Sequence, residues 1–165
     1  MPLVDIMLDQ LVTARRIVED GAEVMPAWLI TTPESSFLVL TRFDTDKPEQ
    51  RERVLVLMTR FMAWKMATSF VLVAETWVDP VISRSGQEAL LVVGVSRHEK
   101  RLAMQKIVRE VPVDFGPVVW LAPEQVDDTY FSLLPPKTSE ITIEEIAELS
   151  AVFGEGGEMQ AERLS

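Results

Sequence analysis

Apolar residues recur at steps of three and four along the first twenty positions, which predicts an amphipathic helix. Charged residues such as Asp5, Asp9 and Glu19 take the other positions. Gly21 follows where a left-handed residue commonly ends a helix. The apolar stripe consists of Leu3, Ile6, Met7, Leu11, Ala14, Ile17 and Val18.

Two apolar, β-rich segments follow, at residues 23–32 and 37–43. Pro33-Glu34-Ser35-Ser36 separates them, and Pro and Ser suit a turn. The pattern predicts a hairpin of two strands.

A second helix is predicted over residues 47–68. Asp46 and Glu49 have the spacing of a capping box, and Pro48 lies in the first turn, where its missing N–H costs nothing. The apolar residues of this helix are spread over more width than one sheet covers. Either the first helix or a second copy of the chain is expected to cover the remaining face. The side chains proposed for an interface between copies are Val56, Met58, Met62 and Met66.

Four further strands are predicted, at residues 70–78, 89–96, 102–109 and 118–122. Asp79-Pro80 ends the first of them, because proline cannot donate to a strand ladder. Residues 79–87 are expected to form a polar loop and residues 97–100 a turn. For residues 101–109 a helix remains an alternative to a strand.

The last ordered element is predicted to be a short helix from Ile143 to about Val152, with Thr142 and Glu145 as its capping box. Residues 123–141 contain three prolines and are expected to wrap the surface irregularly. Beyond Phe153 no apolar periodicity remains, so residues 154–165 are expected to be a disordered acidic tail.

These elements predict one α+β domain over residues 1–153, in the order α-β-β-α-β-β-β-β-α. Most connections between strands are of hairpin length, which favours a mainly antiparallel sheet. We expect a two-layer sandwich in which helices pack on that sheet.

Charge and composition narrow the functional classes. The 165 residues include 16 Lys and Arg against 26 Asp and Glu, a net charge of −10. Such a field repels phosphate backbones and anionic lipids, so neither nucleic acid nor a membrane surface is an expected partner. The chain has no cysteine, which excludes disulfides, thiolate catalysis and thiolate metal sites. It begins without the pattern of a signal peptide and has no apolar run long enough to span a bilayer, so a cytoplasmic location is expected.

Motifs for catalysis are sparse. His98 is the single histidine, so a Ser–His–Asp triad would have to use it, and paired-histidine sites cannot form within one chain. Gly94-Val95-Ser96-Arg97-His98 begins like a nucleophile elbow but lacks its second glycine and leads into a turn rather than a helix. We therefore interpret Ser96 and His98 as turn residues.

Glu75 ends a strongly apolar strand, where an unpaired carboxylate would be costly to bury. We predict an ion pair with Arg84 or Arg109. In the alternative interpretation Glu75, Asp79 and Glu88 hold a metal ion or act as a general base, and Arg84 clamps an anion. Glu75, Trp77 and Arg84 are accordingly the candidate ligand-binding residues.

The segment Ala74-Glu75-Thr76-Trp77, followed by Glu88-Ala89-Leu90-Leu91-Val92-Val93, resembles uncharacterised bacterial and archaeal proteins in which a strand ends in Glu-x-Trp. The resemblance covers about residues 50–110, where Ile107-Val108-Arg109 also fits a strand ending in arginine. It implies no activity and no catalytic residue.

The sequence thus favours a non-enzymatic binding or assembly module that forms a homodimer or binds another protein, with no catalytic residue, metal or cofactor assigned. One alternative is a carboxylate- and metal-dependent hydrolase centred on Glu75, Asp79 and Glu88. Another is a small-ligand pocket between helix and sheet, lined by Met58, Trp64 and Trp77.

Overall fold

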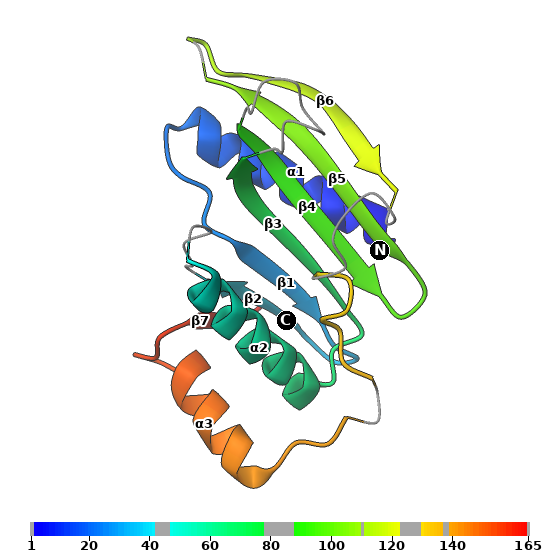
Figure 1. Ribbon diagram of the computed structural model, residues 1–165, viewed down its shortest axis with the longest axis vertical. Helices are drawn as coiled ribbons and strands as arrows, with labels where there is room; N and C mark the ends of the chain where they lie inside the picture. Colours follow the sequence, from blue (N-terminus) through cyan, green and yellow to red (C-terminus); the bar gives the residue numbers. More distant parts are fainter. Residues whose placement is uncertain are drawn as a thin grey trace.

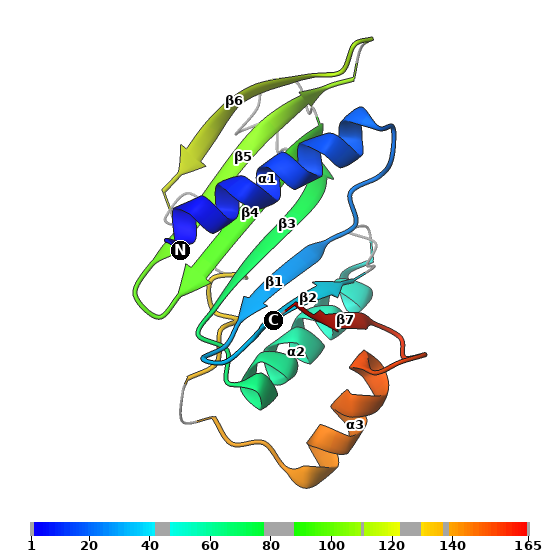
Figure 2. The same ribbon diagram turned by 180° about the vertical axis from the view of Figure 1, so that it is seen from behind.

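The chain folds into one antiparallel sheet with helices on both faces (Figures 1 and 2). The computed structural model describes residues 2–41, 47–77, 88–109, 111–122, 130–136 and 139–164. Within these ranges the elements are α1 (Leu3–Glu19), β1 (Ala27–Thr31), β2 (Ser36–Leu40), α2 (Pro48–Lys65), β3 (Ser69–Trp77), β4 (Glu88–Ser96), β5 (Lys100–Val108), β6 (Asp114–Leu121), α3 (Ile143–Phe153) and β7 (Gln160–Arg163).

The predicted α+β class and the order of its nine elements are confirmed. The seven strands lie in the order β6-β5-β4-β3-β1-β2-β7, and every neighbouring pair is antiparallel. Residues 100–108, for which a helix was the alternative, form strand β5. Strand β6 begins at Asp114, four residues before the predicted start.

Successive side chains of β3 face opposite sides of the sheet, and both sides are buried. Phe70 and Leu72 belong to the core under α2, whereas Val71 and Val73 belong to the core under α1. Helix α1 lies behind the sheet in Figure 1 and in front of it in Figure 2, on the opposite side from α2. The expected two layers are therefore wrong, because the apolar strands need a helix on each face and the molecule has three layers.

Helix α1 packs closely on β3 and β4 through Leu3, Met7, Leu11, Ala14 and Val18. Gly94 of β4 makes this approach possible, since a Cβ atom there would lie 2.5 Å from the sulfur of Met7. The helix ends as predicted: Gly21 has a φ of +80°, a left-handed conformation that glycine adopts without strain.

The core on the other face is built on large aromatic side chains. Trp28 and Phe70 are fully buried with ring centroids 5.5 Å apart, and the Trp28 indole N–H donates to the Thr41 hydroxyl at 3.0 Å. Phe61 of α2 contacts Phe153 of α3 at 4.5 Å between ring centroids. Helix α3 thus closes this core from outside α2.

Part of the second face of α2 is covered from within the chain, although not by α1 as one alternative expected. Helix α1 lies on the other side of the sheet, and α3 with Phe131 and Leu133 packs against α2 instead. Met58 and Met62 are fully buried in this core and cannot form an interface between copies. Val56 and Met66 are exposed, at 58% and 68% respectively.

The termini of α2 and α3 differ in how they are capped. Helix α2 starts at Pro48 with Lys47 as its N-cap and no side-chain cap, and Asp46 of the predicted capping box lies outside the described residues. Helix α3 has the predicted box, in which Thr142 Oγ1 accepts from the Glu145 N–H at 3.1 Å.

The C-terminal segment is ordered, so the prediction of a disordered tail after Phe153 was wrong. Strand β7 pairs with β2 from Phe37↔Arg163 to Leu40↔Gln160 and forms an edge of the sheet. Met159 is 4% exposed within the α2-side core, and the Leu164 N–H donates to the Ser36 carbonyl at 2.8 Å. One buried methionine and a backbone ladder anchor a segment that has no apolar periodicity.

No helix in the described ranges is both long enough and apolar enough to cross a bilayer.

We predict that Met159→Ala lowers the free energy of unfolding by about 2–4 kcal/mol, because it leaves a cavity in a closed core. The exposed Met66→Ala is the matched control and should change stability by less than about 0.5 kcal/mol. Urea unfolding of both variants measures the difference. Equal effects would show that the C-terminal segment does not dock.

Candidate functional site

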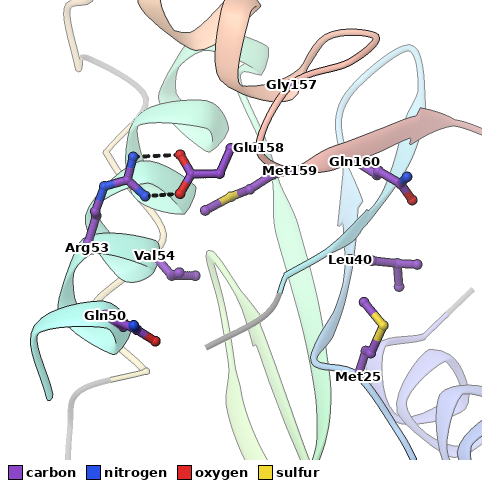
Figure 3. A pocket seen from close by; sticks show the side chains of 9 residues that line it. All are labelled: Met25, Leu40, Gln50, Arg53, Val54, Gly157, Glu158, Met159 and Gln160. Atoms are coloured by element: carbon purple, nitrogen blue, oxygen red, sulfur yellow. Dashed lines mark hydrogen bonds and ion pairs between the residues drawn. The ribbon is translucent and has the colours of Figure 1, made fainter. Parts of the chain in front are cut away.

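A pocket of about 590 Å³ lies where the first turns of α2 approach the end of β2 and the segment that leads into β7 (Figure 3). This volume is in the range of small-molecule sites. The residues that line it are Met25, Leu40, Gln50, Arg53, Val54, Gly157, Glu158, Met159 and Gln160.

Both apolar and polar side chains line the pocket. Val54 and Met159 are each 4% exposed and connect it to the α2-side core. Gln50 and Gln160 are exposed and offer amide donors and acceptors at the opening. Four apolar side chains and four polar or charged ones line it, so a ligand there would meet both apolar surface and hydrogen-bonding groups.

Arg53 and Glu158 form a two-pronged ion pair at this rim, drawn as dashed lines in Figure 3. One contact joins Arg53 Nη2 to Glu158 Oε2 at 2.7 Å, and the second joins Nη1 to Oε1. The hydrogen bond from Arg53 holds the pKa of the Glu158 carboxyl below its ordinary value, and the pKa of Arg53 is raised. The pair ties α2 to the C-terminal segment, and its two charges offset each other.

Glycines place Glu158 and Met159 at the pocket. Gly156 has a φ of +75°, and a Cβ at Gly157 would lie 2.4 Å from the carbonyl oxygens of Ala151 and Val152. The chain therefore turns tightly against the end of α3, where the Met159 N–H donates to the Val152 carbonyl at 3.0 Å. The glycines that suggested disorder are the residues that permit this turn.

A second ion-paired cluster contains the predicted site residue Glu75. Arg109 Nη2 donates to Glu75 Oε1, and Arg109 Nε donates to Glu88 Oε2. The Glu75 side chain is 13% exposed and also accepts the Val24 N–H at 3.3 Å. The hydrogen bond to Glu88 is the largest cause that raises the pKa of Arg109, and the bond to Glu75 adds to it.

The predicted pairing of Glu75 with an arginine is therefore confirmed, with Arg109 as the partner. Arg84 and Asp79 lie outside the described residues, and of Trp77 only the backbone is described. The hydrolase arrangement gains no support from this cluster, because Arg109 already engages Glu75 and Glu88. Among the described residues no group of three potential metal ligands occurs.

The other sequence candidates have structural roles. Ser96 Oγ accepts the backbone N–H of His98 at 3.2 Å and that of Glu99 at 3.1 Å, which is a turn arrangement rather than a nucleophile elbow. Met58 is fully buried, and Trp64 packs edge-on against Phe61 with Lys65 Nζ 3.7 Å from its ring centroid. Met58 and Trp64 thus take part in core packing, and the side chain of Trp77, the third residue of the predicted pocket, lies outside the described part of the structure.

Sequence reasoning missed the pocket at Arg53 and Glu158. Its walls come from four segments, and the ion pair joins positions 105 residues apart. Met159, the one apolar residue among residues 154–160, was the available signal.

No protein-family model matches the sequence, and neither a curated protein nor a solved structure shows significant similarity to it.

The ion pairs that two arginines of α2 form with the C-terminal region predict how the stability of the protein changes as pH falls. Arg53 binds Glu158, and Arg60 Nε donates to Glu145 Oε2 at 2.6 Å. Both carboxyl pKa values are lowered from 4.5, so each pair stabilises the fold above that value and is lost as pH falls through the lowered pKa. We expect stability to fall more between about pH 6 and pH 3.5 in the wild type than in a variant with Arg53→Gln and Arg60→Gln.

The free energy of urea unfolding at the two pH values measures this difference. All four side chains are substantially exposed, so the expected effect is small and decreases with added salt. An identical loss of stability in both proteins would contradict the role of the pairs.

Proposed function

We propose that the chain is a non-enzymatic binding module that holds a small ligand in the pocket beside Arg53 and Glu158. The observation that carries the proposal is an open pocket of ligand size whose lining combines core residues with paired polar groups. Arg53 and Glu158 are the only ionised side chains among the described lining residues, and they neutralise each other. Nothing in this arrangement activates a nucleophile or a general base, so binding is the chemistry that it supports.

The ligand class follows from the rim. A charged ligand would have to break the Arg53–Glu158 pair or leave its own charge without a partner in the pocket. An uncharged molecule would leave the pair intact, bury an apolar part against Val54 and Met159, and bond to the amides of Gln50 and Gln160. We therefore expect an uncharged amphipathic ligand.

A library of uncharged fragments, screened by amide chemical shifts, tests this proposal. Binders should shift the resonances of residues 157–160 and of the first turns of α2. Gln50→Trp places a large side chain at the pocket and should abolish these shifts. Glu49→Trp is its control, because Glu49 is exposed next to Gln50 but does not line the pocket. Absence of any binder, or equal binding by both variants, would overturn the proposal.

Self-association is the second candidate, now at the sheet edge formed by β6. Val119 and Trp120 are 44% and 41% exposed on this strand, and among the described strands β6 pairs with β5 alone. Unpaired edges are templates for further strands, and a two-fold pairing of β6 with a second copy would continue the sheet. Pro117, which lacks an N–H, limits such pairing to the residues after it.

We predict a dimer at a protein concentration of about 100 μM, a range in which a micromolar interface is populated. Trp120→Arg should make the protein monomeric without unfolding it. Val111→Arg is the control, since Val111 is fully exposed outside β6. Light scattering that shows a monomer for the wild type would rule out this interface.

A further inference from the structure

A second, smaller pocket of about 400 Å³ lies at the other end of α2. It shares no lining residue with the pocket at Arg53. Met62, Ala63 and Met66 contribute from α2 and its C-cap, and Pro135 and Pro136 contribute from the segment that crosses the sheet. Arg97 is the one charged side chain in its described lining.

The guanidinium of Arg97 is held in place by two backbone carbonyls. Nη1 donates to the Pro135 carbonyl and Nη2 to the Ala67 carbonyl, each at 3.1 Å. The Nε atom is buried and has no hydrogen-bond partner. Because a guanidinium has five N–H donors, three of them are not used by these two bonds. The group is therefore fixed in orientation and incompletely satisfied.

Within the part of the chain that the structure describes, the charge of Arg97 also has no counter-ion. Arg53, Arg60, Arg101 and Arg109 each contact a carboxylate, but no ion pair of the described residues includes Arg97. Its side chain is only partly exposed and lies among methionine, alanine and proline. A partly buried cation in apolar surroundings is costly unless an anion compensates it.

We propose that this pocket binds the carboxylate of a small monocarboxylic acid with an apolar body. A single guanidinium matches one carboxylate through parallel N–H···O bonds, and the apolar walls cover the remainder of the molecule. A phosphate needs more hydrogen-bond donors than this pocket offers, where Arg97 is joined by few other polar groups. The net charge of −10 also opposes a ligand that carries more than one negative charge.

The ligand would also bridge elements that are distant in sequence. Arg97 already links the turn between β4 and β5 to residues on either side of the pocket, Ala67 and Pro135. A carboxylate that binds the folded protein and not the unfolded chain raises the melting temperature as its concentration increases.

Titration with octanoate and with its uncharged analogue octanamide tests the proposal. Amide chemical shifts and the melting temperature are followed, with octyl phosphate as a third probe for a general anion site. We expect octanoate to bind about tenfold or more tightly than octanamide, since only the carboxylate makes charge-assisted bonds. The largest shifts should fall on residues 66–68, 97 and 135–136.

Two variants separate binding from folding. Arg97→Gln should abolish the preference for octanoate, although it also weakens the bonds to Pro135 and Ala67. Met66→Glu keeps Arg97 in place and puts a carboxylate at the pocket, so it should reduce octanoate binding about tenfold or more by competition and repulsion. Val56→Glu is its control on the same helix at similar exposure and should leave binding unchanged.

Equal affinity for octanoate and octanamide, or unchanged octanoate binding in a folded Met66→Glu, would overturn the proposal. Tighter binding of octyl phosphate than of octanoate would overturn the choice of a carboxylate. Because the fragment screen uses uncharged molecules and other residues, its failure would not affect this result.

Discussion

Strands β3 and β4 carry apolar side chains toward both sides of the sheet, and this constraint places every helix. Val71 and Val73 require cover on one side, and Phe70 and Leu72 require it on the other. Helix α1 supplies the first cover, and it packs so closely over Gly94 that a Cβ atom there would require Met7 to shift. Helix α2 supplies the second, and some of its apolar side chains, such as Leu55 and Phe61, extend beyond the sheet. Residues of the C-terminal third of the chain pack against them.

This arrangement explains why the two pockets lie at the ends of α2. On the core-facing side of the helix, the middle is filled by large side chains such as Met58 and Phe61, which belong to the α2-side core. At the two ends of the helix, hydrogen bonds from arginines connect the neighbouring segments. These segments contain Glu158 at one end and Pro135 at the other. Arg53 engages a carboxylate there, whereas Arg97 engages only carbonyl groups. The two ends therefore offer different chemistry to a ligand.

Most of the local structure could be predicted from the sequence, because periodicity and capping are local properties. The stripe of α1, the capping box at Thr142 and the turn at Gly21 all depend on residues within a few positions of one another. Even the ion pair of Glu75 was predictable, since the cost of burying a carboxylate requires a partner, and Arg109 was one of two candidates.

The failures concern contacts between distant residues. Periodicity shows that a helix has an apolar face, but it does not show on which side of the sheet that face packs. The sequence analysis therefore predicted two layers where the structure has three. The C-terminal strand was missed because β7 is held by backbone bonds to β2 and by one methionine, neither of which produces a pattern. Both pockets join segments far apart in the chain, and the isolated apolar residue Met159 is the one local signal for the pocket at Arg53.

The division into two cores has a consequence for how the protein is made. Every residue of the core under α1 lies at or before Val118, whereas the core under α2 also contains Phe131, Leu133, Leu149, Phe153 and Met159. During synthesis from the N-terminus the first core can therefore close while the second still lacks residues that complete it. Until they emerge from the ribosome, the outer side of α2 remains open to water. Over that interval the nascent chain exposes apolar side chains of α2 that the finished fold buries.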